Sequence, residues 1–393
     1  MKRNYYLNIL LAIILPISCF SQTDTIDYLG QTPPEDIPKI FAPGLVSLKD
    51  RLELGSSFSP DGKEFAFGIW GNNEATSFIY YMKQKNNIWS LPVIASFIGQ
   101  DSVSLPMFSP DGKSLTFIKI PSNSHKPDIW ICNRTNNGWT VPARFPSPVN
   151  SELREASNGL TMSRTLYFTS NRDTVNKHCG NIFRSKPIKG EYLTVERQDN
   201  LNTPYDEEGL FISPDEDYII VQSWQGNSGH DLYISYTRYD NTWSKPEKLD
   251  SIINSSNIEQ RPYVSPDKKY LFFTRTVIDK QYNPLESDIY WVSTKKVFKP
   301  YTFHPISDTI IIKGNRYKHS LPINTFKDIL DRKLKCKASL VNGNNLPKWL
   351  KFDITSQTFS GTPNDTGELE IKIMAIDENM NTCSDEFKIV IKK

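Results

Sequence analysis

Apolar and polar residues alternate in short runs along most of the chain, as in 114–120 (SLTFIKI), 166–170 (LYFTS), 217–223 (DYIIVQS) and 269–276 (KYLFFTRT). A period of two, with β-branched and aromatic residues bounded by Gly, Pro, Asn and Asp, is typical of β-strands. A second set of runs follows the first at 128–134, 181–187, 231–237 and 288–294. No long stretch has the helical period of 3.6. The pattern predicts an all-β protein.

The strands recur with a period of about fifty residues. A turn that begins at Ser59 (SPDG) returns at Ser109 (SPDG), Ser213 (SPDE) and Ser265 (SPDK), and a degenerate copy starts at Leu160. Each copy carries one strand before the turn and two after it, then a fourth that starts near a Trp-x-x-Pro. Four strands per unit are typical of a β-propeller blade.

The ring also has to close. Residues 38–46 have the pattern of a fourth strand, but the three strands that should precede it are missing. The last copy, in turn, lacks a clear fourth strand. We therefore expect residues 38–46 to supply the outer strand of the last blade, which gives five blades. The alternative of six blades requires a further repeat.

The Ser-Pro-Asp-Gly turns, the Asp-Ile-Trp/Tyr third strands and the period together resemble the TolB-type, WD-like β-propeller repeats of exported bacterial proteins, over about residues 30 to 300. The resemblance implies a binding or scaffolding platform more than a particular reaction.

Residues 301–393 do not continue the repeat. The strings LPKWLKFD (346–353) and TFSGTP (358–363) resemble the dystroglycan-type cadherin-like domain, which implies an immunoglobulin-like β-sandwich. Cadherin-like domains imply calcium, for which the candidate ligands are Asp328, Asp331, Asp377 and Glu378. The alternative for these residues is polar turns at one end of a sandwich.

Residues 1–21 have the features of an export signal: Lys2 and Arg3, then an apolar run, then small residues. Cleavage after Ser21 predicts a periplasmic or extracellular protein, and lipidation of Cys19 predicts an outer-membrane lipoprotein. The domains are then a signal peptide (1–21), a propeller (22–300) and a sandwich (301–393), with no transmembrane segment in the mature chain. Export permits a Cys336–Cys383 disulfide, and free thiols are the alternative.

The formal net charge is +2, and the sequence has no basic stripe of the kind that binds nucleic acid. The Asp of the repeated turn is expected to hold a corner by accepting backbone hydrogen bonds, because equivalent residues in every blade do not make an active site of unlike groups.

The opposite face, the mouth of the propeller, collects unlike groups at the start of the first strands and the end of the second strands. These candidate ligand-binding residues are Glu53, Trp70, Lys119, Glu155, Arg172, Glu208 (with Glu207 as its alternative), Trp224, Glu259 and Arg275. One hypothesis is that they bind a protein or carbohydrate ligand. The other is that Glu–Arg pairs tie adjacent blades together.

The sequence thus predicts a non-catalytic, exported binding or scaffold protein of the cell envelope, with no cofactor. No catalytic residue is assigned. The alternative is a glycan-active hydrolase or lyase that uses two mouth carboxylates as acid and base.

Overall fold

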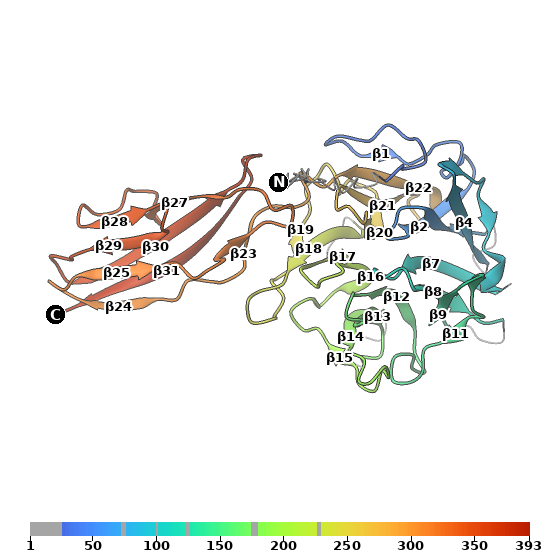
Figure 1. The fold of residues 1–393 in the computed structure, drawn as a ribbon, viewed down its shortest axis with the longest axis horizontal. Coiled ribbons are helices and arrows are strands. Elements are labelled where there is room, and N and C mark those ends of the chain that lie inside the picture. Colours follow the sequence, from blue (N-terminus) through green and yellow to red (C-terminus); the bar gives the residue numbers. More distant parts are fainter. Residues whose placement is uncertain (1–25, 72–75, 100, 123–125, 174–179, 226–228) are drawn as a thin grey trace, which may run out of the picture.

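The computed structural model describes residues 26–71, 76–99, 101–122, 126–173, 180–225 and 229–393. Within these ranges the regular structure is β-strand, apart from one 3₁₀ turn, η1 (Ser96–Ile98). A ring of sheets and an elongated sandwich lie end to end, with the C-terminus at the far end of the sandwich (Figure 1). The prediction of an all-β protein is confirmed.

Five antiparallel blades form the ring. Their inner strands are β2 (Leu52–Phe58), β7 (Ser102–Phe108), β12 (Glu155–Leu160), β16 (Asp206–Ile212) and β20 (Ile258–Val264). The second strands are β3 (Glu64–Trp70), β8 (Ser114–Ile120), β13 (Leu166–Ser170), β17 (Tyr218–Trp224) and β21 (Tyr270–Ile278). The third strands are β4 (Ser77–Lys85), β9 (Asp128–Thr135), β14 (Asn181–Ser185), β18 (Asp231–Tyr236) and β22 (Pro284–Ser293). The first and fifth blades are joined into one sheet where β2 pairs with β22 in parallel, Leu52 opposite Ser287.

The outer strands are short. In the first two blades they are split, into β5 (Ile88–Trp89) with β6 (Val93–Ile94), and β10 (Gly138–Trp139) with β11 (Ala143–Arg144). The third and fourth blades end in β15 (Glu196–Arg197) and β19 (Glu247–Lys248), and β1 (Lys39–Ile40) is the outer strand of the fifth.

The pairing of β1 with β22 closes the ring. Lys39 lies opposite Trp291, Ile40 lies opposite Tyr290, and the Phe41 amide donates to the Ile289 carbonyl. Phe41 is fully buried against Phe58, Phe65, Phe272 and Trp291. The predicted five blades and their closure by residues 38–46 are confirmed, and the described residues form no sixth blade.

The propeller core lies between successive blades. Phe117 and Val103 of the second blade pack with Ile79 of the first, and Phe168 of the third packs with Ile129 of the second. Side chains on both faces of the second strands are therefore buried, so the alternation in their sequences does not divide them into a buried face and an exposed face.

Every inner strand contains a register shift near its start. At this bulge Gly55, Leu105 and Arg261 have positive φ. A bulge turns the following side chains with respect to the preceding ones, and it lies between the mouth residues and the rest of each inner strand.

The second part is a sandwich of two sheets. One sheet has the order β24 (Thr309–Ile312), β31 (Thr382–Lys392), β30 (Gly367–Ile376), β27 (Lys335–Leu340), and the other has β25 (Tyr317–Ser320), β29 (Thr358–Gly361), β28 (Leu350–Asp353). The core between them includes Phe359, Ile371, Ile373 and Phe387. The immunoglobulin-like sandwich is confirmed.

Of the two alternatives for Cys336 and Cys383, the structure has free thiols and not the disulfide. Cys336 on β27 lies opposite Ala375 on β30, and Ala375 lies opposite Cys383 on β31. The two cysteines are thus two strand spacings apart, about 9 to 10 Å, whereas a disulfide requires Cα atoms within about 7 Å. Both are free thiols.

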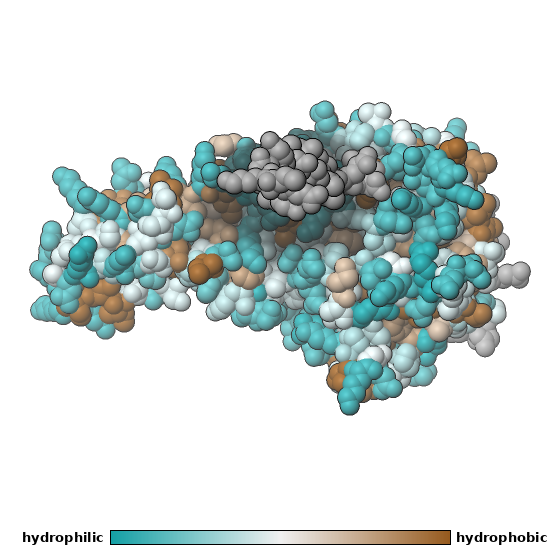
Figure 2. All heavy atoms as spheres, viewed as in Figure 1, coloured by the Kyte–Doolittle hydropathy of each residue, from teal (hydrophilic) through white to brown (hydrophobic). Residues whose placement is uncertain are grey.

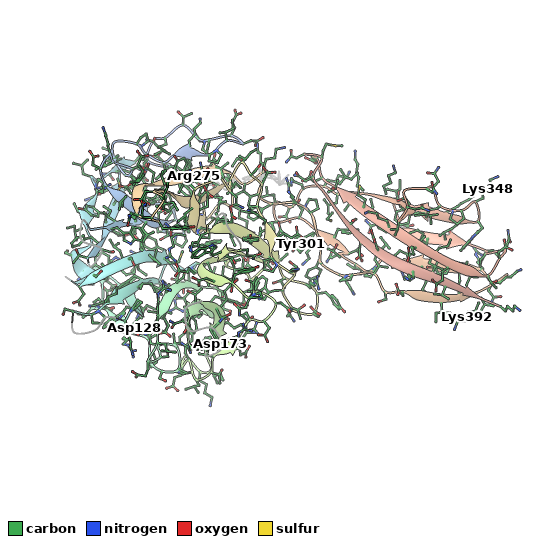
Figure 3. The ribbon with its side chains drawn as sticks, turned by 180° about the vertical axis from the view of Figure 1, so that it is seen from behind. Asp128, Asp173, Arg275, Tyr301, Lys348 and Lys392 are labelled. Atoms are coloured by element: carbon green, nitrogen blue, oxygen red, sulfur yellow. The ribbon has the colours of Figure 1, made fainter. Side chains whose placement is uncertain are left out.

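A short connection joins the two parts. It forms β23 (Tyr301–Thr302), which pairs with β26 (Phe326–Lys327) of the sandwich side. Tyr301 stacks on Tyr236 of the fourth blade with ring centroids 4.3 Å apart, and Tyr239 stacks on His304 at 4.0 Å. Figure 3 shows Tyr301 at this passage, far from Lys348 and Lys392 at the outer end of the sandwich.

The surface seen in Figure 2 is mainly hydrophilic, with apolar side chains scattered over both parts. None of the helical structure in the described ranges has the length and hydropathy needed to cross a bilayer.

Candidate functional site

Three of the predicted mouth carboxylates do not reach the surface. Glu53, Glu155 and Glu259 are fully buried at the starts of the inner strands. Glu155 accepts from the Ser151 amide (3.2 Å) and hydroxyl (2.7 Å), and Glu259 accepts likewise from Ser255 (2.9 and 2.7 Å). Each carboxylate therefore holds the connection that leads into its own blade.

The arginines complete the same arrangement. Arg172 donates to Glu155 at 2.8 Å and to the Val149 carbonyl at 2.5 Å. Arg275 donates to Glu259 at 2.7 Å and to the Ile253 carbonyl at 2.8 Å. The Glu–Arg pairs predicted from the sequence therefore do form. Each pair lies within one blade and the segment that leads into it, so neither pair joins adjacent blades.

In the first blade the arginine comes from the residue just before the inner strand and not from the end of the second strand. Arg51 donates to Glu53 at 2.6 Å and also to the Val46 carbonyl. Burial raises the pKa of Glu53 to about 7, with Arg51 opposing the rise, and burial also raises the pKa of Glu259. These three glutamates have no surface for a ligand, which corrects the expectation that they present their side chains to the mouth.

Two further predicted residues belong to the first two blades. Lys119, at the end of β8, pairs with Asp101 at 2.8 Å and lies over the Trp130 ring at 4.5 Å. Trp70, at the end of β3, is half-buried opposite Leu52. Neither residue belongs to the cluster of charged groups at the start of the fourth blade, which is described next.

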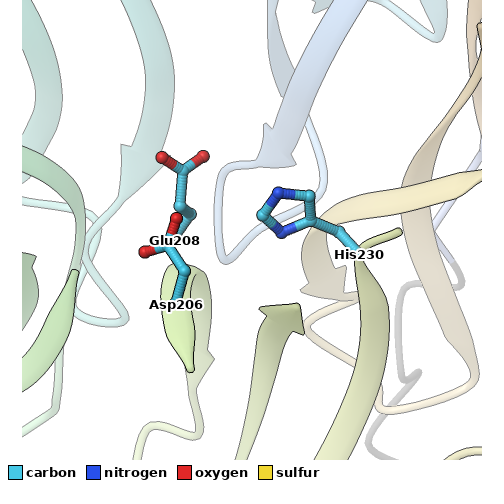
Figure 4. Close-up of side chains that lie close together, drawn as sticks. All are labelled: Asp206, Glu208 and His230. Atoms are coloured by element: carbon cyan, nitrogen blue, oxygen red, sulfur yellow. The ribbon is translucent and has the colours of Figure 1, made fainter. Parts of the chain in front are cut away.

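The start of β16 brings unlike groups together. Asp206, Glu208 and His230 offer ligand atoms that all lie within 4.8 Å of one another (Figure 4). Asp206 and Glu208 face the mouth, Glu208 from the bulge between Glu207 and Gly209, while Glu207 is fully buried (Figure 4). Of the two glutamates considered from the sequence, Glu208 is the one at the mouth.

Two arginines from neighbouring blades surround Glu208. Arg154 of the third blade pairs with its carboxylate at 2.8 Å, and Arg261 of the fifth lies 3.7 Å from its second oxygen. Arg261 also donates to the Glu208 carbonyl at 2.9 Å. Here, and not at the buried glutamates, ion pairs do connect adjacent blades.

The two carboxyl groups and the imidazole of this cluster have pKa values that differ from their ordinary ones. Burial and the neighbouring Glu208 raise the pKa of Asp206 to about 6. Burial opposes the charge on Glu208, but Arg154 and Arg261 outweigh it and lower the pKa of that carboxyl. Burial lowers the pKa of His230, so the imidazole is neutral at neutral pH.

The neighbours of His230 fix its tautomer. The Gln222 side chain accepts from the Arg261 amide through Oε1 (3.3 Å), so its Nε2 faces the His230 Nδ1 at 3.1 Å and donates to it. The ring proton then lies on Nε2. Since metals bind the unprotonated nitrogen of a neutral imidazole and Glu208 is held by two guanidiniums, the three residues fit a metal poorly.

Exposed aromatic rings lie beside this cluster. Trp224 pairs with Asp206 in the β16–β17 ladder, is 40% exposed, and lies 5.4 Å from the His230 ring and 6.2 Å from Tyr282. Tyr282 is 60% exposed and Tyr205 is 48% exposed. We name Arg154, Tyr205, Asp206, Glu208, Trp224, His230, Arg261 and Tyr282 the mouth cluster.

Sequence reasoning found two of these eight, Glu208 and Trp224. The signals that it passed over were the run Tyr205-Asp206-Glu207-Glu208 and the position of His230 directly before a third strand. Arg154, Arg261 and Tyr282 come from other blades, and only the closed ring brings them to the cluster.

The calcium candidates lie elsewhere, at the sandwich end next to the propeller. Asp328 and Asp377 are buried, but Arg332 pairs with them at 2.8 and 2.9 Å. Asp331 and Glu378 are exposed. Arg332 holds both carboxylates, and backbone amides also donate to each of them, so these residues do not fit a calcium ion.

Comparison with known proteins matches part of the chain. Residues 299–392 match the family described as "Putative Ig domain". TolB from Acinetobacter baumannii is 14% identical with a TM-score of 0.39, over 63% of this chain and 55% of that one. The β-propeller domain of the Trilobed protease from Pyrococcus furiosus is 14% identical with a TM-score of 0.32, over 62% and 70%.

The chain thus spans about half the length of the Acinetobacter TolB, and likenesses of this size carry no conclusion on function. No curated protein matches the sequence.

Proposed function

We propose that this chain is an exported, non-catalytic binding protein of the bacterial cell envelope, which takes a polar protein or carbohydrate ligand at the mouth cluster. The observation that supports this proposal is that partly buried acidic, basic and imidazole groups from three blades meet beside exposed aromatic rings. Such a mixture of convergent polar groups and apolar faces is typical of recognition sites. The sandwich then acts as a spacer or adhesive module.

Export rests on the sequence of residues 1–21 and on the resemblance to exported propellers. The cleavage site and Cys19 lie outside the described residues. A periplasmic or extracellular location follows from cleavage, and an outer-membrane lipoprotein follows from lipidation of Cys19.

The pairing of the carboxylates supports binding over catalysis. Glu208 is held by Arg154, and Asp206 accepts from the Gly180 amide at 2.5 Å. The glycan-active hydrolase or lyase is the second candidate, and the raised pKa of Asp206 is the observation that favours it, because a general acid must keep its proton near neutral pH.

The test is a binding screen with the mature chain against arrays of oligosaccharides and of purified envelope proteins. For a binder found in this way, Arg154→Ala should lower affinity about tenfold or more, since it removes a charge from the centre of the cluster. The matched control is Arg184→Ala, which removes an arginine paired with the exposed Glu196.

An affinity that is equal in wild type and Arg154→Ala would contradict the proposed site. Cleavage of a bound oligosaccharide, lost in Asp206→Asn, would replace binding with the catalytic alternative.

A further inference from the structure

The floor of the mouth cluster offers both hydrogen-bond donors and acceptors. The Asp206 and Glu208 carboxylates accept, the His230 Nε2–H donates by the tautomer argument, and the Arg154 guanidinium donates. A sugar hydroxyl both donates and accepts, and neighbouring hydroxyls on a pyranose ring present that combination at short spacing. A row of mixed groups suits such a ligand better than it suits an anion or a cation.

The walls of the cluster are flat and aromatic. Trp224 and Tyr282 leave 40% and 60% of their surfaces exposed, and their rings lie 6.2 Å apart at an interplanar angle of 41°. An exposed aromatic face combines apolar area with a polar edge, which matches the C–H face and hydroxyl rim of a sugar. An apolar peptide side chain would instead require a closed apolar recess.

A small cavity lies beside the cluster, where the inner strands of the ring meet. Residues of all five inner strands, among them Gly55, Asn158, Leu210 and Arg261, line this cavity of about 20 Å³. This volume holds about one water molecule. A sugar ring does not fit in this volume, so a ligand of the mouth cluster has to lie on the aromatic walls.

The small cavity contains buried polar groups that lack partners among the described residues. Asn158 is 2% exposed, and neither its Oδ1 nor its Nδ2 has a hydrogen bond; the Arg261 Nε also has none. Leaving such groups without a hydrogen-bond partner destabilises the fold, so a partner in this cavity is favoured. Because Arg261 lines this cavity and contacts Glu208, a water molecule or ligand hydroxyl here would be continuous with the mouth cluster.

From these observations, and resting on the proposed function, we infer that the ligand of the mouth cluster is a carbohydrate, bound with one sugar ring on Trp224 and Tyr282 and its hydroxyls on the polar floor.

The experiment titrates the mature chain with linear hexasaccharides built from glucose, mannose, galactose, xylose or N-acetylglucosamine, and separately with purified envelope proteins, by calorimetry. At least one oligosaccharide should bind. Trp224→Ala should then weaken it about tenfold or more, because the stacking face is lost, while Trp224→Phe keeps a smaller face and should recover part of the affinity.

Tyr239→Ala is the matched control, since Tyr239 is 52% exposed but stacks on His304 at the junction with the sandwich; its affinity should equal that of wild type. An oligosaccharide that binds equally to wild type and Trp224→Ala would overturn the inference. Binding of an envelope protein that Arg154→Ala abolishes, with no oligosaccharide bound, would overturn the carbohydrate assignment and leave the proposed function standing. Binding of neither class would count against both.

Discussion

Glu207 and Glu208 are adjacent in sequence and have opposite environments. Glu208 faces the mouth between Arg154 and Arg261, which keep it charged. Glu207 points into the blade, where Thr203 and Ser223 donate hydroxyl hydrogen bonds at 2.5 and 3.1 Å. Its Oε2 has no hydrogen bond among the described residues. A buried carboxyl with hydroxyl partners and no paired cation favours the protonated form.

Burial raises the pKa of Glu207 from its ordinary value of 4.5 to about 7. The folded state thus binds this proton more tightly than the unfolded chain. The stability contributed by Glu207 is fully present below the unfolded pKa and is lost as the pH rises through 7.

Glu207→Gln should therefore melt close to wild type at pH 5 and be more stable than wild type at pH 8.5, by about 1 to 3 kcal/mol. Denaturant unfolding at both pH values measures the difference. In the control, Glu155→Gln, Arg172 loses its buried carboxylate, and stability at pH 8.5 should fall by about 2 to 4 kcal/mol. Equal pH dependence of wild type and Glu207→Gln would show that Glu207 is charged in the fold.

At the scale of the strand and turn, the repeated corner is held by its Asp. In the second blade the Asp111 carboxylate accepts from the Ser109 hydroxyl at 2.6 Å and the Lys113 amide at 3.0 Å. Asp61 and Asp267 make the equivalent bonds in the first and fifth blades. The interpretation of this Asp as structural is confirmed for these three corners.

The fourth corner differs although its sequence is similar. Ser213 still accepts from the Tyr218 amide at 3.1 Å, but the Asp215 carboxylate makes no hydrogen bond within the part of the chain that the structure describes. Asp215 is thus a natural control for Asp111.

Asp111→Ala should lower the free energy of unfolding by about 1 to 2 kcal/mol, because two hydrogen bonds to a carboxylate are lost. Asp215→Ala should lower it by less than about 0.5 kcal/mol, as for an ordinary surface substitution. Urea unfolding of both variants tests the comparison. Equal losses would mean that the carboxylate acts through something other than these bonds.

The repeat predicted the strands and turns well, because the sequence of a single blade is enough to define them. The alternation, the turns and the fourth-strand signal at residues 38–46 are all read within one period. The mouth cluster was harder, since Arg154, Glu208 and Arg261 lie about 50 residues apart and meet only in the closed ring. The direction of a mouth side chain also depends on the bulge beside it, for which Glu207 and Gly209 give no clear sequence signal.

At the scale of the whole molecule, one arginine links the sandwich to the propeller. Arg332 pairs with Asp328 and Asp377, and it donates to the Lys295 carbonyl at 3.1 Å and the Phe298 carbonyl at 2.7 Å at the end of the last blade. Resemblance alone suggested calcium at these carboxylates. The sequence did not reveal that Arg332 would reach both of them, because Asp377 comes from a different turn.

Arg332→Ala should destabilise the full chain by about 3 to 5 kcal/mol, since it leaves two buried carboxylates without their cation. Wild type should melt at the same temperature in millimolar calcium and in excess chelator, because Arg332 and backbone amides already hold both carboxylates. Calorimetry of the full chain measures both effects. Lys333→Ala, which removes the neighbouring exposed charge, should leave the melting temperature unchanged. A wild-type chain that loses stability in chelator would show that a bound metal ion, and not Arg332 alone, holds this junction.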